Sequence, residues 1–124
     1  MYNLFLDDIR EPENITIYKK AKYNWIVVQN YDDFVNYIEE NGLPNMISLD
    51  HDLHFEHYAA MGKRLKFKEK TGYDALIWLC EYIEKNNLEI PKIKFHTSNF
   101  VGMKNMNNYL YDFEQRYTNE NKEN

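Results

Sequence analysis

Four short apolar runs, separated by longer polar or helical segments, restrict the fold of this chain more than any other feature. β-branched and aromatic residues typical of strands dominate residues 2–6, 25–29, 46–49 and 93–96. Apolar residues recur at helical spacing in residues 31–42, 71–87 and 101–117, whereas residues 13–22 carry only weak helical signals. Because helical crossovers return successive strands in the same direction, the sequence predicts an α/β fold: a three-layer open parallel sheet of about four strands with flanking helices.

Chain length and composition favour one compact unit. The 124 residues are 44% hydrophobic, enough to bury a core without disulfides, and no repeat or linker rich in proline, glycine or serine divides them. We therefore predict a single domain over residues 1–117 and a polar tail over 118–124. The one cysteine, Cys80, falls within an apolar helical pattern and is predicted to be a packed thiol rather than a nucleophile.

Charge and hydropathy argue against several classes of protein. A formal net charge of −5 disfavours a general binder of duplex nucleic acid, which would carry a basic surplus. No stretch approaches the roughly 20 apolar residues of a membrane span, and the start of the chain lacks the basic lead and apolar run of a signal peptide. We expect a cytoplasmic protein without a membrane partner, and the sequence leaves its oligomeric state open.

Polar side chains gather where three of the four runs end. In open parallel sheets the carboxyl ends of the strands share one edge, and ligands bind there. The first run leads into Asp7, Asp8 and Arg10, the third into Asp50, His51 and Asp52, and the fourth into His96, Thr97 and Ser98. We expect these residues to line one rim. Charged groups are costly to desolvate there unless a cation or an anionic ligand compensates them.

The acidic residues of this rim predict a divalent metal site. Carboxylates in one cleft repel each other, and a hard cation such as Mg²⁺ or Mn²⁺ relieves the repulsion by taking oxygen ligands. The metal candidates are Asp7, Asp8 and Asp50. A structural interpretation also exists, since aspartate after a strand often caps the next helix or forms a turn. Two adjacent acids after one strand and a second pair after another favour the metal site.

The remaining rim residues match the needs of phosphate chemistry. Imidazole exchanges protons near neutral pH, and we assign proton transfer to His96, oriented by His51 or Asp52. Hydroxyl and guanidinium groups bind phosphate oxygens, a role that we assign to Thr97, Ser98 and Arg10.

A basic segment follows the second group of rim residues. Residues 54–70 form the longest irregular stretch, and its cations include Lys63 and Arg64, which are candidates for phosphate binding. One interpretation is a lid that closes cationic side chains over phosphate groups. The other is a solvated run of charge, and the sequence favours neither over the other.

Five motifs in this order resemble one family of small receiver-like proteins. They are LFLDDIREP, WIVVQNYDDF, GLPNMISLDHDL, TGYDALIWL and HTSNFVGMKNM, and they span about residues 4–110. The chain is similar to the cyclic-phosphate-processing receiver-like family, abbreviated cREC, a truncated relative of response-regulator receiver domains. The resemblance implies a receiver- or flavodoxin-like sheet that lacks the fifth strand, and a pocket that processes or senses a cyclic phosphate on a nucleotide or RNA end.

Three functions are compatible with these residues. The leading hypothesis is a metal-dependent phosphodiesterase that hydrolyses a cyclic phosphate of a nucleotide or RNA end. The alternative is a non-catalytic module that binds a cyclic nucleotide or another small phosphorylated ligand, to sense or sequester it. The third is a phosphoacceptor signalling domain. In the receiver domains that the chain resembles, the aspartate that ends the third strand, here Asp50, is phosphorylated, but we expect the fifth strand and its lysine to be missing from this chain.

Overall fold

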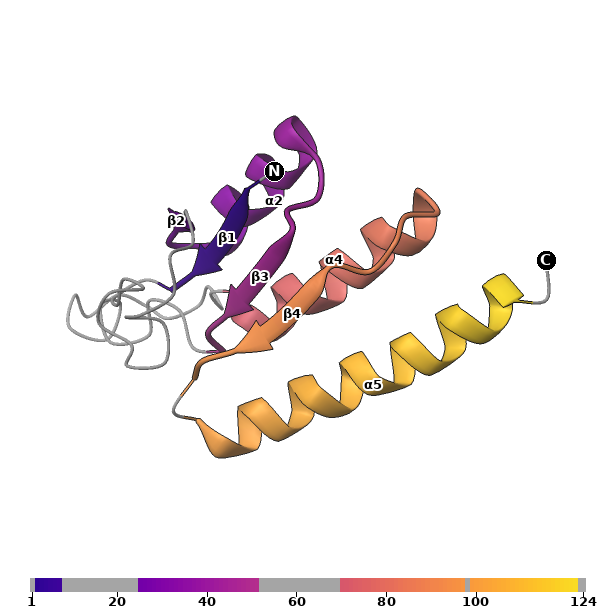
Figure 1. The fold of residues 1–124 in the computed structure, drawn as a ribbon. Coiled ribbons are helices and arrows are strands. Elements are labelled where there is room, and N and C mark those ends of the chain that lie inside the picture. The colour runs from indigo at the N-terminus through magenta and orange to yellow at the C-terminus, as the bar shows by residue number, and fades with distance from the viewer. Residues whose placement is uncertain (1, 8–24, 52–69, 98, 123–124) are drawn as a thin grey trace.

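The structure is a computed structural model of the 124-residue chain, and it describes residues 2–7, 25–51, 70–97 and 99–122. Four parallel strands form one sheet in the order β2-β1-β3-β4 (Figure 1). Their bounds are Asn3–Leu6 for β1, Trp25–Val28 for β2, Met46–Leu49 for β3 and Lys92–Phe95 for β4. The predicted α/β class and four-stranded parallel sheet are confirmed.

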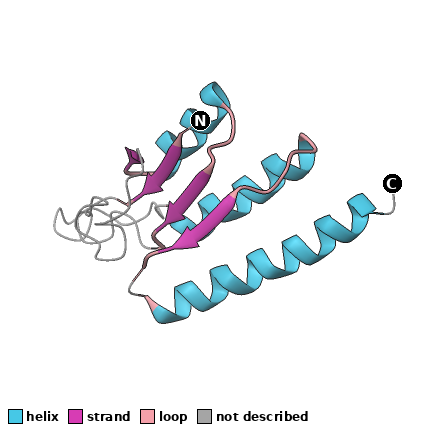
Figure 2. Cartoon of the chain, viewed as in Figure 1, coloured by secondary structure: helices cyan, strands magenta, loops and turns pink. Residues whose placement is uncertain are grey.

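Besides the four strands, the described part of the chain contains three helices (Figure 2). They are α2 (Tyr31–Asn41), α4 (Gly72–Lys85) and α5 (Phe100–Lys122). The side chain of Asn30 accepts from the Asp33 amide at the start of α2, and Thr71 forms a capping box with Asp74 at the start of α4. The weak helical segment predicted at residues 13–22 lies outside the described residues.

The last helix is longer than the sequence predicts. Residues 118–122, which we expected to belong to a polar tail, continue α5 to Lys122. The physical reason is local: these residues are polar but include neither glycine nor proline, so the backbone hydrogen bonds of the helix can continue. Polarity alone therefore did not mark the end of the helix.

One face of the sheet and the three helices enclose the hydrophobic core. The ladder pairs Leu4 with Ile26 and Ile47, and Leu6 with Val28 and Leu49. Apart from Ile26, which is partly buried and packs against it, these side chains belong to one cluster with the inner residues of α2, α4 and α5: Phe34, Ile38, Leu76, Leu79, Ile83, Met106, Leu110, Phe113 and Tyr117. Figure 1 shows α2 and α4 behind the sheet. Among the described residues, no helix is long and apolar enough to cross a membrane.

The opposite face of the sheet carries the alternate residues of the same strands, because successive side chains of a strand point to opposite sides. Phe5 pairs with Val27 and Ser48 in the ladder, and Ser48 pairs with Lys94. Asp7, Asp50 and His96 continue this set beyond the strand ends. Phe5 and Ser48 are fully buried, yet neither belongs to the core cluster between the sheet and the helices.

The start of α4 packs directly on the backbone that follows β3. The Gly72 amide donates to the His51 carbonyl oxygen at 2.7 Å. A Cβ atom on Gly72 would lie 1.6 Å from the Asp50 carbonyl oxygen, far closer than any real contact. Glycine is therefore required here for close approach, and the approach fixes the position of α4 relative to the end of β3.

Replacing Gly72 by alanine tests this contact, because the contact decides whether the free energy of unfolding rises or falls. Without a clash, alanine in a helix would stabilise the fold by up to about 1 kcal/mol relative to glycine. With the clash, we expect Gly72→Ala to lower the free energy of unfolding by about 3 kcal/mol, measured by urea denaturation. Asn105→Ala, on the exposed side of α5, is the control and should change it by less than about 0.5 kcal/mol. A Gly72→Ala protein at least as stable as the parent would contradict the contact.

Cys80 is a packed thiol, as predicted, with 1% of its surface exposed in α4. Burial raises its pKa to about 12, so the reactive thiolate is scarce at neutral pH. We expect iodoacetamide to modify the folded protein far more slowly than the urea-unfolded protein, with the single adduct counted by intact mass. Similar rates in the two states would mean that the thiol is accessible.

Candidate functional site

Three polar residues stand side by side where β1, β3 and β4 end. Each follows directly after a strand: Asp7 after β1, Asp50 after β3 and His96 after β4. The Asp50 amide donates to the Leu6 carbonyl oxygen and the His96 amide to that of Leu49, both at 3.0 Å, so the ladder extends to these residues. Since neighbouring strands lie about 4.8 Å apart, the row brings together residues that are distant in the sequence.

The side chain of His96 crosses β3 to reach β1. Its Nε2 atom lies 3.0 Å from Oδ2 of Asp7, and its Nδ1 atom lies 2.7 Å from Oγ of Ser48, in the middle of β3. The ring stacks on Phe5, with centroids 4.3 Å apart and planes 10° apart. The side chains of His96 and Asp7 are only 1% and 0% exposed. The result is a buried hydrogen-bonded chain of Ser48, His96 and Asp7.

The first turns of α4 and α5 both pack against His51, whose amide in turn binds Asp50. Oδ1 of Asp50 accepts a hydrogen bond from the His51 amide at 2.8 Å. The ring of His51 makes an edge contact with Tyr73 of α4, at a centroid distance of 6.3 Å. A Cβ atom on Gly102, in the first turn of α5, would lie 2.6 Å from this ring. Both helices therefore press on His51, and Gly102 leaves the room that its ring occupies.

Thr97 belongs to the turn that begins α5. Its hydroxyl oxygen accepts a hydrogen bond from the Asn99 amide at 3.1 Å, and Oδ1 of Asn99 accepts one from the Gly102 amide at 2.9 Å. These bonds connect the end of β4 to the helix. A hydroxyl that accepts one bond retains a donor, so the predicted contact of Thr97 with a phosphate is compatible with this turn.

The structure brings together part of the predicted site. Asp7, Asp50, His51, His96 and Thr97 lie along one edge of the sheet, as expected for the carboxyl ends of parallel strands. The other predicted residues fall outside the described ranges: Asp8, Arg10, Asp52, Lys63, Arg64 and Ser98. The catalytic, metal-binding and phosphate-binding roles assigned to these residues stay predictions.

Sequence reasoning missed three residues that shape this edge: Ser48, Asn99 and Gly102. Ser48 had a detectable signal, because it is the one polar residue in the buried run MISL. A buried hydroxyl needs a hydrogen-bond partner, and the partner here is His96. Gly102 gave no signal, since only the fold shows that the ring of His51 lies against it.

Two carboxylates of this edge fit the requirements of a magnesium-like cation. Mg²⁺ is commonly held by one or two carboxylates together with water and substrate phosphates, and Asp7 and Asp50 are carboxylates at the ends of adjacent strands. In the part of the chain that is described, no group of three or more histidine, cysteine, aspartate or glutamate residues is arranged to hold a metal by itself.

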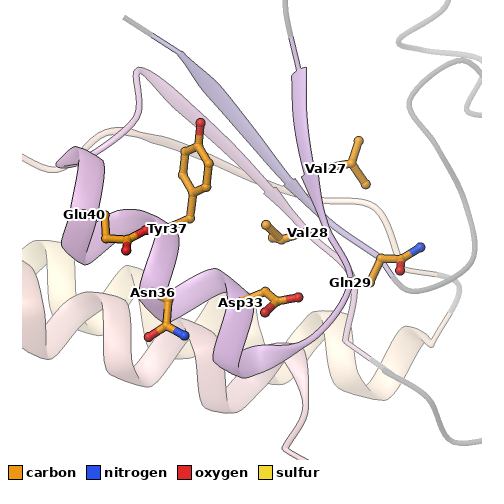
Figure 3. A pocket seen from close by; sticks show the side chains of 7 residues that line it. All are labelled: Val27, Val28, Gln29, Asp33, Asn36, Tyr37 and Glu40. Atoms are coloured by element: carbon orange, nitrogen blue, oxygen red, sulfur yellow. The ribbon is translucent and has the colours of Figure 1, made fainter.

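The described residues also form an open hollow of about 530 Å³ between β2 and α2 (Figure 3). Strand β2 and helix α2 line it with Val27, Val28, Gln29, Asp33, Asn36, Tyr37 and Glu40. None of the predicted site residues contributes to it. The anionic side chains Asp33 and Glu40 disfavour a phosphate ligand there.

Comparison with known families identifies the chain. The model of the family described as "Cyclic-phosphate processing Receiver domain" matches residues 2–112. The match covers most of the chain, and the protein therefore belongs to this family, as the five sequence motifs predicted. Searches of curated proteins and of solved structures gave no match.

A double-mutant cycle tests whether the buried bond between His96 and Asp7 is an energetic link. Removing either partner leaves the other buried and poorly satisfied, so the penalties of Asp7→Ala and His96→Ala should overlap. We expect a coupling of about 2 kcal/mol in urea denaturation with a chelator present. The control cycle uses the exposed pair Arg116 and Glu84, whose oxygen and nitrogen lie 2.7 Å apart, and it should give a much smaller coupling. Additive effects of Asp7→Ala and His96→Ala would show that no such link exists.

Proposed function

We propose that this member of the cyclic-phosphate-processing receiver family is a metal-dependent phosphodiesterase that hydrolyses a cyclic phosphate on a nucleotide or RNA end. Family membership supports the substrate class. The observation that supports the chemistry is the row of Asp7, Asp50 and His96 at the ends of three adjacent strands. It places two carboxylates where parallel sheets bind ligands.

The anionic edge needs a cation before it can accept a phosphate. Carboxylates repel a phosphodiester, and we assign Asp7 and Asp50 to hold Mg²⁺ or Mn²⁺, with Asp8 as a third ligand. When bound, such a cation neutralises phosphate charge and lowers the pKa of a coordinated water. The basic side chains Arg10, Lys63 and Arg64 are assigned to the phosphate oxygens, together with Thr97 and Ser98.

Ring opening requires two proton transfers. A bond forms between a water oxygen and phosphorus, one phosphorus–oxygen bond of the ring breaks, the water loses a proton and the departing oxygen gains one. The sequence assigned proton transfer to His96. The geometry favours a different division of roles, because both ring nitrogens of His96 lie within hydrogen-bond distance of Asp7 and Ser48 and its side chain is buried. We therefore assign proton transfer to His51, and to His96 the task of holding Asp7.

The second candidate function is binding without hydrolysis. The family description supports it equally, because a receiver-like domain can bind a cyclic phosphate without opening it. In this case the edge would capture a cyclic nucleotide and leave it intact. The phosphoacceptor function, with Asp50 as acceptor, is supported only by the position of Asp50 at the end of β3.

Turnover assays decide between these functions. The purified protein should be incubated with 2′,3′-cyclic and 3′,5′-cyclic nucleotides and with an RNA bearing a terminal cyclic phosphate, with EDTA, Mg²⁺ or Mn²⁺, and the products separated by chromatography. We expect metal-dependent ring opening, reduced about 100-fold or more by Asp50→Asn, because this change weakens a ligand of the cation. Asp112→Asn, an exposed aspartate of α5, is the matched control and should leave the rate unchanged.

Each alternative has a distinct outcome. Calorimetric binding with recovery of the intact cyclic nucleotide, and no product under any condition, would replace hydrolysis by the binding function. A mass increase of one phosphoryl group after incubation with acetyl phosphate, lost in Asp50→Asn, would support the phosphoacceptor.

A further inference from the structure

We propose that Ser48 is a positioning residue: its hydroxyl holds the ring of His96 so that the Nε2 proton is aimed at Asp7, which keeps that carboxylate oriented toward the ligand edge. The inference rests on the proposed function in one respect, the role of Asp7 as a ligand of the cation. Ser48 itself lies in the middle of β3, the strand that pairs with β1.

The first step is the position of the proton. A carboxylate accepts hydrogen bonds, so the contact of 3.0 Å between Nε2 and Asp7 requires a proton on Nε2. In the neutral ring Nδ1 then carries a lone pair and accepts from the Ser48 hydroxyl at 2.7 Å. The opposite assignment would direct the lone pair of Nε2 at the anionic oxygens of Asp7. For the neutral ring, the two contacts therefore agree on one arrangement of protons.

The second step is the orientation of the ring. Rotating an imidazole by a half turn exchanges Nδ1 with a carbon atom and carries Nε2 to another position, which would remove its proton from Asp7. Phe5 stacks on the flat side of the ring but does not distinguish the two orientations. The hydroxyl of Ser48 does distinguish them, because it finds a nitrogen in one and a carbon in the other.

The third step is burial. Ser48 is 0% exposed and the side chain of His96 only 1%, so bulk water is poorly placed to replace the serine hydroxyl. A hydroxyl in an otherwise apolar strand costs stability unless it is hydrogen-bonded, and His96 supplies the bond. Hydrogen bonds of this kind commonly tune metal affinity through the carboxylate they hold.

The proposal is tested first in the metal-free protein by ¹⁵N NMR of the histidine rings. In the parent we expect His96 to show a protonated Nε2, with a slowly exchanging N–H resonance, and an unprotonated Nδ1. Ser48→Ala should broaden or abolish that N–H resonance and shift Nδ1 as its hydrogen bond is lost. Ser48→Thr, which keeps the hydroxyl, should restore both signals. Thr118→Ala, an exposed hydroxyl of α5, is the control and should change neither.

The second readout is the affinity for Mn²⁺ alone, measured by calorimetry. We expect Ser48→Ala to weaken binding about 10-fold and Ser48→Thr to retain it. A role limited to stability would lower the melting temperature but leave the N–H resonance and the Mn²⁺ affinity unchanged. If Ser48→Ala does not fold, Ser48→Cys, with a weaker donor of similar size, should show both effects in milder form.

Two results would overturn the proposal: a neutral His96 with its proton on Nδ1 in the parent, or Ser48→Ala and Ser48→Cys proteins with unchanged ring signals and Mn²⁺ affinity. Neither result depends on turnover. A parent that shows the expected signals and Mn²⁺ effect but opens no cyclic phosphate would refute the proposed hydrolysis and leave the role of Ser48 intact. A parent that binds no Mn²⁺ would refute the metal assignment, and the ring signals would still decide whether Ser48 positions His96.

Discussion

The hydrogen bond between His96 and Asp7 is the interaction on which the candidate site depends. It joins the first and fourth strands across the third, over 89 positions of sequence, and it lies almost entirely out of water. A buried carboxylate is costly unless donors satisfy it, and the imidazole supplies one donor in a fixed direction. The bond therefore does two things at once: it lets Asp7 stay at the edge of the core, and it orients this carboxylate.

The sheet makes this bond possible through strand order and side-chain alternation. Because β3 lies between β1 and β4, a side chain from β4 must cross β3 to reach β1. Where it crosses, the ring of His96 contacts Ser48, which is small and polar, and a larger apolar side chain there would occupy the path of the ring. Phe5 provides the surface on which the ring lies. The helices cover the other face, so the packing of the main core and the arrangement of the site are largely separate.

The parts of the fold that repeat a simple pattern could be predicted from the sequence. The strands and the buried stripes of the helices follow from spacing alone, and the shared edge of Asp7, Asp50 and His96 follows from parallel strands. The direction of the His96 side chain could not be predicted, because it depends on contacts with Ser48, Asp7 and Phe5 that lie on other strands. The close contacts at Gly72 and Gly102 are equally absent from local patterns, since they arise between segments distant in the chain. The helical residues 118–122 show that a polar composition does not mark a helix end.

We propose that side chains from separate strands form a single cation-binding edge, in which His96 holds Asp7 beside Asp50. The most direct measurement is a crystal structure of the protein with Mn²⁺, using the anomalous signal of the ion to locate it. We predict a peak within bonding distance of carboxylate oxygens of both Asp7 and Asp50, with Nε2 of His96 still donating to Asp7. An ion bound elsewhere with neither carboxylate as ligand, or His96 turned away from Asp7, would contradict the account.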